Sequence, residues 1–425
     1  MSSFSRPIAN FLAPNLEKDD TLLAFKVIFQ PWIWKEGKFI YEFEKIFNDY
    51  FRFVDAISFN SGRAALFAIL NSLSIKKNDE ILIQAFTCNS LVNPILWQQT
   101  KPVFVDIVGV NNNGFLDLNL DPIDLEKKIT KNSKAVIVQH TFGQPADIEK
   151  IQEICKKYNL FLIEDCAHSL GVKYKGKLLG TFGDASFFSF GRDKIISSTF
   201  GGMAGSINSL LASKIRKFQK DLNYPSYFWI FQQLFHPIIF SLILPTYNSG
   251  FGKFLLYFFQ KIKFLSKGTS FEEKQGRKPN FFPKRFPNAL AILAKNQFLK
   301  LEKFNRRRQE NTKFYFENLP DNFILPTERE DIQFLKMFPI LVENQKEILS
   351  ESKKYGIIFD DQWYQSPIMP PGTDLSKMQY RMGSCRKAEK VASKIINLPT
   401  NPAVSKNDLD RVLNFIIKYA KPIES

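Results

Sequence analysis

The stretch FFSFGRDKIISSTFGGMA, from Phe187 to Ala204, decides how the rest of the chain is interpreted. Its first residues are aromatic or small, which predicts a β-strand over residues 185–190. Lys194 follows this strand closely, and the Gly201-Gly202 pair then predicts a turn. A lysine after an apolar strand is most often a surface residue, so its role depends on what the neighbouring strands bring to the same place.

Residues 37–221 alternate between short β-forming runs and amphipathic helical patterns. Apolar spacing predicts helices over residues 37–50, 90–98, 123–129 and 147–158, and another that begins at Arg63. Strands are predicted over 56–59, 81–83, 103–105, 135–139, 160–163 and 185–190. The alternation indicates an α/β fold with a mostly parallel central sheet and helices on both faces. Ligands bind at the carboxyl ends of such strands, where Ser61, His140, Asp165 and Ser189 lie.

The rest of the chain divides by composition. Residues 1–36 are expected to form an irregular N-terminal segment before the large domain over 37–221. An aromatic-rich helical insertion follows over 222–275, and a long helix over 288–315 dominates a linking segment, 276–319. A smaller C-terminal α/β domain is expected over 320–425. In it, strands are predicted over 334–342 and 357–363, and a last helix from Ser405 with Asp408 as a capping residue.

The part of the insertion over residues 222–268 has two interpretations. It is rich in aromatic residues, poor in acids and punctuated by Pro225, Pro237 and Pro245. It can form helices that pack on their own protein or on a dimer partner. It can also lie on a membrane surface with its lysines on the polar side. These lysines are Lys253, Lys261, Lys263 and Lys267.

Composition bounds the possible partners and the compartment. The formal charge of +16 reflects a lysine-rich composition or attraction to an anion, such as a nucleotide phosphate, an acidic glycan or an anionic membrane. No basic stripe with interleaved aromatics predicts nucleic-acid binding. The four cysteines contain no CxxC pair, so neither a disulfide framework nor a metal site is predicted. Without an apolar signal core or a run of about 18 apolar residues, the chain is expected to be cytoplasmic.

The segment IEDCAHS places an acid, Asp165, at the end of a buried strand. An acid in such a place must be paired or must serve a charge. The pyridine nitrogen of pyridoxal phosphate requires such a group, because the ring acts as an electron sink when this nitrogen is protonated. His168 could then lie against the ring or its hydroxyl. On these residues alone, a capping aspartate with a hydrogen-bonded histidine remains the alternative.

The role predicted for Lys194 depends on the residues around it. A lysine that forms a Schiff base needs partial desolvation and positive surroundings, and Arg192 lies close in sequence. Upstream, a strand, the turn Asn60-Ser61-Gly62 and a helix start together form a potential anion site, although an ordinary β-α turn has the same pattern. Together, and in this order along the chain, the turn at Ser61, Asp165 at a strand end and Lys194 favour a lysine that holds an aldehyde cofactor.

These segments resemble the DegT/StrS family of sugar aminotransferases. The resemblance spans residues 37–418 and is carried by FNSGRAAL, NDEILIQAFTCNS, PVFVDI, HTFGQPADIEKI, LFLIEDCAHSLG, GDASFFSFGRDK, GGMAG and INLPTNP. It implies fold type I, the aspartate aminotransferase fold, and the cofactor pyridoxal 5'-phosphate.

The resemblance also implies a role for each matching residue. Lys194 would bind the cofactor covalently and move the proton, Asp165 would bind the ring nitrogen, and His168 would lie beside the ring oxygen. Ser189 would donate to the phosphate, and Ser61, Gly62 and Arg63 would form the phosphate turn, the last two through backbone amides.

Four positions depart from the family pattern. Arg63 replaces a usual threonine, so that the phosphate gains a guanidinium instead of a hydroxyl. Cys88 stands where an aromatic often stacks on the ring, so Phe86 or another side chain is expected to stack there. Phe200 replaces an acid, and Pro283 lies near the place of an asparagine that reaches the partner subunit's phosphate. A related dehydrating branch has histidine in place of the lysine, and Lys194 argues against that branch.

The resemblance implies a homodimer that moves an amino group from glutamate or glutamine to a nucleotide-linked keto-deoxysugar for surface polysaccharide. Two other classes stay open. One is a regulator or sensor that binds pyridoxal phosphate without turnover. The other is a membrane-surface protein of glycan assembly.

Overall fold

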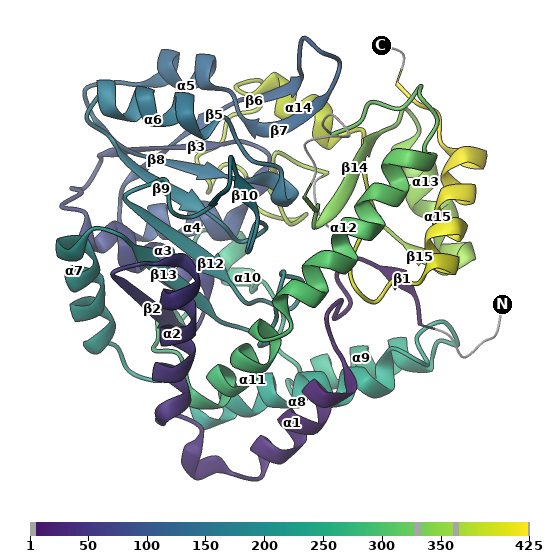
Figure 1. Ribbon diagram of the computed structural model, residues 1–425, viewed down its shortest axis with the longest axis horizontal. Coiled ribbons are helices and arrows are strands. Elements are labelled where there is room, and N and C mark those ends of the chain that lie inside the picture. The colour runs from purple at the N-terminus through teal and green to yellow at the C-terminus, as the bar shows by residue number, and fades with distance from the viewer. Residues whose placement is uncertain (1–5, 327–332, 360–364, 424–425) are drawn as a thin grey trace.

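A seven-stranded sheet forms the centre of the larger domain in the computed structural model, which describes residues 6–326, 333–359 and 365–423 (Figure 1). In spatial order its strands are β2 (Asp55–Phe59), β13 (Gly202–Ser206), β12 (Ala185–Ser189), β9 (Phe161–Asp165), β8 (Ser133–Gln139), β3 (Glu80–Gln84) and β5 (Lys101–Val105). β13 runs antiparallel to both neighbours and the other pairs are parallel, so the predicted mostly parallel sheet is confirmed.

Helices cover both faces of this sheet, as predicted. Ile83 and Ile163 face α3 (Gly62–Ser72), α4 (Asn89–Trp97) and α7 (Ser209–Lys220). Leu82 and Leu162 face the other side, because successive strand residues point to opposite faces. The helices of that side are α2 (Lys38–Phe51), α5 (Pro122–Lys128), α6 (Ile148–Lys157) and α11 (Asn288–Phe298). Burial on both faces explains why the central strands read as continuous apolar runs.

The smaller domain lies to the right in Figure 1 and is reached through α12 (Leu301–Asn318). Its strands β14 (Met337–Leu341) and β17 (Ile395–Pro399) pair antiparallel. Its helices are α13 (Gln345–Glu351), η4 (Ser352–Tyr355) and α15 (Lys406–Tyr419). α14 (Arg386–Ala392), from the same part of the sequence, packs into the core of the larger domain at the top of Figure 1. Short pairs complete the chain: β1 (Ile8–Ala9) with β15 (Ile357–Ile358), β4 (Thr87–Cys88) with β16 (Ile368–Met369), β6 (Ile107–Val110) with β7 (Leu116–Leu120), and β10 (Lys173–Tyr174) with β11 (Lys177–Leu178).

The N-terminal segment is not irregular, so that prediction is wrong. It contains α1 (Lys18–Ile28) and the short helix η1 (Pro31–Ile33). Glu17 and Asp20 cap α1 by accepting hydrogen bonds from each other's backbone. The helical period is hard to see in the sequence because α1 carries apolar residues on its outer face as well as on its buried face.

The long helix predicted over residues 288–315 is two helices. α11 ends at Phe298 and α12 begins at Leu301, with the backbone of Lys300 outside the helical region. Lys300 instead reaches α1 and pairs with Asp19 and Asp20. No glycine or proline marks this break in the sequence, which is why the helical pattern runs across it.

Two predictions in the C-terminal domain are shortened or refined. Of the strand expected over 357–363, the structure shows β15, and residues 360–364 lie outside the described residues. The helix start at Ser405 is confirmed: its hydroxyl accepts from the Asp408 backbone N–H, and the Asp408 carboxylate accepts from the Ser405 N–H.

The insertion forms two helices, α8 (Tyr227–Ile243) and α9 (Phe251–Lys261), followed by the short α10 (Phe271–Lys274). α8 continues through Pro237 and packs against α1 and α11, as the first interpretation of the insertion expects. In α9 only Gly252 is buried. Among the described residues, no helix combines the length and the apolar character that crossing a membrane requires.

Candidate active site

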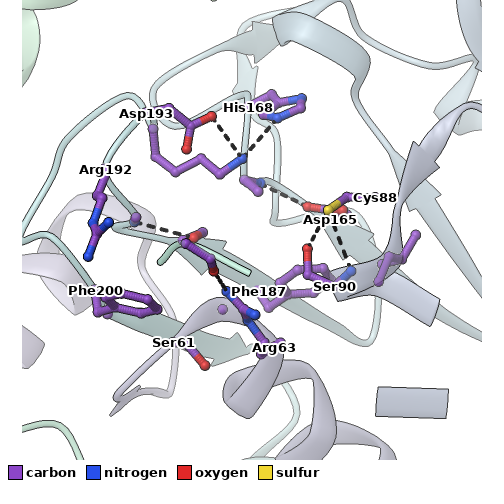
Figure 2. Close-up of a pocket in the computed structure, with 18 of the residues that line it drawn as sticks. Ser61, Arg63, Cys88, Ser90, Asp165, His168, Phe187, Arg192, Asp193 and Phe200 are labelled. Atoms are coloured by element: carbon purple, nitrogen blue, oxygen red, sulfur yellow. Dashed lines mark hydrogen bonds and ion pairs between the residues drawn. The ribbon is translucent and has the colours of Figure 1, made fainter. Parts of the chain in front are cut away.

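The ends of three strands meet at one edge of the sheet. Asp165 ends β9 opposite Phe187 of β12, and Ser189 ends β12 opposite Gly202 of β13. Gly202 in turn lies opposite Phe59, the last residue of β2 before the Ser61 turn. A pocket with about 880 Å³ of space, including its open mouth, lies at this edge (Figure 2). All seven predicted site residues line it, namely Ser61, Gly62, Arg63, Asp165, His168, Ser189 and Lys194.

The turn before α3 forms the floor of an anion site. The Ser61 hydroxyl accepts a hydrogen bond from the Ala64 N–H at 3.1 Å and so caps the helix. The backbone N–H groups of Gly62 and Arg63 precede this capped position, where a helix dipole favours an anion. Close approach requires glycine, because a Cβ on Gly202 would lie 2.4 Å from the Gly62 nitrogen. Ser189 completes the floor.

The Arg63 guanidinium is directed away from this turn. It donates to the Glu273 carboxylate and to the Gly268 carbonyl at 3.0 Å, and it lies 4.7 Å from the centre of the Phe282 ring. Burial lowers the pKa of Arg63 to about 10. Arg63 therefore contributes only its backbone to the phosphate turn, while its guanidinium holds the last segment of the insertion, residues 266–273.

Arg192 holds the same segment from the other side. Its guanidinium donates to the carbonyl and to the hydroxyl of Ser266, both at 2.6 Å. It also lies 5.4 Å from the centre of the Phe200 ring, which Arg63 approaches to 6.0 Å. Phe200, in the place of an acid, is thus flanked by two cations across the pocket from His168 (Figure 2).

The Lys194 ammonium lies between a neutral ring and a carboxylate. Its Nζ is 3.2 Å from His168 Nε2 and 3.6 Å from Asp193 Oδ2. Burial, and then the neighbouring Lys194 and Lys336, hold the pKa of His168 well below its usual range, so the imidazole is neutral. Burial opposes ionisation of Asp193, but Lys194 and Lys336 hold the pKa of this carboxyl far below its usual value. Lys194 therefore has a permanent counter-ion.

Asp165 is a buried carboxylate that lacks an ion pair among the described residues. One of its oxygens accepts from the Ala167 N–H at 2.9 Å. Burial raises its pKa to about 6, although the Ala167 bond, Lys194 and His140 act in the opposite direction. A cation placed against this oxygen pair would offset the cost of burial. The protonated ring nitrogen of pyridoxal phosphate is such a cation.

His168 provides an independent test of whether the cofactor fits. Its Nδ1 is buried and has no hydrogen-bond partner among the described residues. Because Nε2 accepts from the Lys194 ammonium, Nδ1 carries the proton and requires an acceptor. The ring is held in place by stacking on Phe142, with 5.7 Å between the ring centres. An oxygen on the cofactor ring would meet that need, so the residues present fit pyridoxal phosphate.

Sequence reasoning missed the residues that hold the lysine loop. Asn15 donates from its side chain to the Lys194 carbonyl at 2.5 Å. The buried Arg308 donates to the Asn15 side-chain oxygen at 2.6 Å and to the Ile195 carbonyl at 2.9 Å. The signal for Arg308 would have been an arginine on the inner face of an amphipathic helix. Asp193 could have been found from its position beside the lysine.

Phe86 does not supply the expected ring stack. It is fully buried and does not line the pocket; its ring lies 6.4 Å from that of Phe142, behind His168. Cys88 does line the pocket, and its sulfur accepts from the Ser90 hydroxyl at 2.8 Å. Pro283 follows a cis peptide bond and lies outside the pocket lining.

A cluster behind the pocket contains residue types that can bind a metal, but its side chains already make hydrogen bonds to the protein. His140, Glu164 and Cys166 lie close together and are buried. The Glu164 carboxylate accepts three backbone N–H groups from residues 180–183, each at 2.7 Å. His140 Nδ1 accepts from the Ala146 N–H, so its Nε2 donates to Glu164 at 3.2 Å. The cluster therefore holds two loops in place.

Comparison with known proteins adds family evidence. The sequence profile of the DegT/DnrJ/EryC1/StrS aminotransferase family matches residues 15–222 and 263–417, which leaves out all of α8 and all of α9. The chain is 26% identical over 384 residues to the dTDP-3-amino-3,6-dideoxy-alpha-D-galactopyranose transaminase of Aneurinibacillus thermoaerophilus, an alignment that covers 89% of each protein.

A second relative is more similar over a shorter region. The chain is 40% identical over 172 residues to the GDP-perosamine synthase of Escherichia coli O157:H7, an alignment that covers 40% of this chain and 46% of that protein. Among solved structures, S. venezuelae DesV superposes with a TM-score of 0.73 at 20% identity, covering 99% of this chain and 100% of that one. This last likeness supports the fold.

Proposed function

Because the chain belongs to the DegT/DnrJ/EryC1/StrS aminotransferase family, whose members use pyridoxal phosphate, we propose that it transfers an amino group to a nucleotide-linked keto-deoxysugar. The observation that carries this proposal is the convergence of Lys194, Asp165 and the Ser61 turn on one pocket. When bound there, pyridoxal phosphate carries the amino group between donor and acceptor and withdraws electrons from the reacting carbon.

The residues of the chain have separable roles in this proposal. Lys194 would bind the cofactor covalently and, once released from it, move a proton through its Nζ at the carbon that bears nitrogen. Asp165 would keep a proton on the ring nitrogen, and the neutral His168 would donate from Nδ1. The backbone of Gly62 and Arg63, together with Ser189, would hold the phosphate.

A second cavity beside the pocket supports a phosphate-bearing substrate. It shares Arg192, Asp193, Gly268 and Thr269 with the first pocket, so the two are continuous. Its lining carries five cationic side chains, which are Arg192, Lys253, Lys267, Lys274 and Lys353. Asp193 is its acidic residue and is already paired with Lys194 and Lys336. A nucleoside diphosphate carries the opposite charge and would be favoured there.

The remaining parts of the proposal rest on the family likeness. The amino donor would be glutamate or glutamine, the product would enter surface polysaccharide, and the protein would act as a homodimer. We place the reaction in the cytoplasm, where the four cysteines, which form no disulfide among the described residues, would stay reduced. Membrane contact by the insertion would leave the lysine pocket itself clear, because no described residue of α8 or α9 lines it, whereas Lys253 of α9 lines the adjoining cavity.

The experiment follows the two half-reactions separately. The cofactor absorbance of the purified protein is recorded with glutamate or glutamine, which should convert it to the aminated form. That form is then offered GDP-, dTDP- and UDP-linked keto-deoxysugars, and the products are weighed by mass spectrometry. An amino sugar nucleotide with return of the original absorbance supports the proposal. Amination without discharge by any of these acceptors would favour the regulator alternative.

A further inference from the structure

Three helices that carry exposed apolar side chains lie along one edge of the molecule. α1 packs against α8, and α8 packs against α9. Figure 1 shows them at the lower edge, below the central sheet. α8 buries Ile230, Leu234 and Ile243 and forms the base on which the other two helices rest. We call this edge, with the outward residues of α1, η1, α8 and α9, the lower edge.

The α1 part of the lower edge has an apolar stripe that faces solvent. Leu22, Phe25 and Phe29 recur at helical spacing, and the phenylalanines are 52% and 64% exposed. Their rings contact each other edge to face at 5.1 Å. Trp32 in η1 continues the stripe and is 75% exposed. Since Ala24 and Val27 already satisfy the buried face of α1, the outer stripe is not needed for packing within this chain.

The α9 part repeats this arrangement. Phe251, Phe254 and Phe258 form a continuous stack of rings, with 6.5 Å and 6.1 Å between successive centres. Phe254 is 59% exposed. Other exposed apolar residues nearby are Tyr257 in α9, Ile262 and Phe264 just after it, and Phe228 and Leu242 in α8. Single exposed apolar residues are ordinary, but a contiguous group of this kind marks a contact surface.

The charge around these side chains has one sign. The sequence contains no acid between Asp221 and Glu272, whereas Lys253, Lys261 and Lys263 lie in that interval and are exposed. Lys267 lies in the same interval and is exposed as well; Lys253 and Lys267 also line the cavity proposed for the substrate, whereas Lys261 and Lys263 do not. The acids of α1 do not oppose this charge.

Those acids are already paired with lysines at the start of the neighbouring helix. Asp19 lies 2.9 Å from Lys300 Nζ, and Glu17 lies 2.6 Å from Lys303 Nζ. Lys18 and Lys26 of α1 are exposed. The lower edge therefore combines bulky aromatic groups with a positive field.

We propose that the lower edge lies on the surface of an anionic lipid bilayer, with its aromatic side chains inserted among the headgroups. Helices with aromatic residues and lysines on adjacent faces bind such interfaces. A second copy of the chain seated here would bring two lower edges of the same local sign together, so charge at this edge favours the lipid, and the homodimer proposed above would form through another surface. The helices lie on the bilayer, since none of the described ones is able to span it.

The test uses the full-length holoprotein and sedimentation with vesicles. Vesicles of phosphatidylcholine with about 30% phosphatidylglycerol should pellet the protein, and pure phosphatidylcholine should bind at least about tenfold less. The double variant Phe254→Ser/Phe258→Ser should lose at least about tenfold of the binding to anionic vesicles. Lys261→Gln/Lys263→Gln should lose several-fold and should reduce the salt dependence. Ile123→Ser, which alters an equally exposed residue of α5, is the matched control and should bind normally.

Several results would overturn the proposal. Equal pelleting of the wild type and the Phe254→Ser/Phe258→Ser variant would do so, as would equal binding to both vesicle types. Concentration-dependent self-association without lipid that disappears in this variant would assign the lower edge to a second copy. None of the altered residues lines the lysine pocket or the adjoining cavity. Amination of the cofactor in solution should therefore be unchanged in every variant, which shows that the fold is intact.

Discussion

Replacement of Asp165 by asparagine should make the apoprotein more stable and the enzyme inactive. Asparagine keeps the shape of the side chain and the oxygen that accepts from the Ala167 N–H, and removes only the charge. Burial raises the pKa of Asp165 from 3.8 to about 6, a difference that corresponds to about 3 kcal/mol against the ionised form. The apoprotein of Asp165→Asn should therefore be more stable by about 3 kcal/mol at pH 8.

The pH dependence fixes the sign of this effect. A carboxyl whose pKa is higher in the folded state than in the unfolded state binds its proton more tightly when folded. The wild type therefore loses stability as the pH rises from about 4 through about 6, and the variant does not. The stability difference should vanish below about pH 4, where the wild-type carboxyl is neutral in both states.

Urea unfolding of both apoproteins at several pH values measures this difference, and cofactor titration and turnover measure its functional cost. Loss of a buried partner for a charged ring nitrogen should cost at least about 100-fold in turnover.

Asp117→Asn is the control. Burial raises the pKa of the partly buried Asp117 to about 6 as well, but this residue lies in β7, outside the pocket lining. It should change stability in the same direction and leave turnover intact. An Asp165→Asn apoprotein less stable than the wild type at pH 8, or one with normal turnover, would refute the reasoning.

Three further outcomes are expected. Gly202→Ala should weaken cofactor binding by about 100-fold in a titration, because the new Cβ would force the Gly62 turn to move; unchanged affinity would argue against the phosphate turn. Asn15→Ala should lower kcat by about tenfold and leave KM unchanged, because the carbonyl of Lys194 loses its donor; an effect confined to KM would contradict a positioning role. Cofactor affinity of the wild type should fall by about tenfold from pH 7 to pH 5 as Asp165 becomes protonated, and a flat profile would contradict that role.

The sheet and the pocket residues could be predicted because their signals are local. β9 and β12 are short apolar runs with polar residues at their carboxyl ends, and parallel strands bring those ends together. That rule alone predicts Asp165, Ser189 and the Ser61 turn at one edge of the sheet. The antiparallel β13 was missed, because Gly201-Gly202 signals a turn and gives no sign that Gly202 begins a strand.

What could not be predicted depends on contacts between distant segments. Arg63 was expected to direct its charge at a phosphate, but Glu273, more than 200 positions later, holds it. Asn15 reaches Lys194 from a segment predicted to be irregular, and Arg308 supports it from the helix predicted over residues 288–315. The Asn15 contact has no spacing signal in the sequence, and the sign of the Arg308 contact is an arginine on the inner face of a helix, which names no partner. The helix α1 could not be predicted either, because apolar residues on its exposed face hide the helical period of its buried face.

The identity of the lysine that binds the cofactor tests the account most directly. The purified holoprotein is reduced with borohydride, which makes the bond to the cofactor permanent, and its peptides are examined by mass spectrometry. We predict that the cofactor mass is found on Lys194 and is absent from a Lys194→Ala protein treated in the same way. A label on Lys336, which shares the Asp193 carboxylate, or on any other lysine would contradict the account.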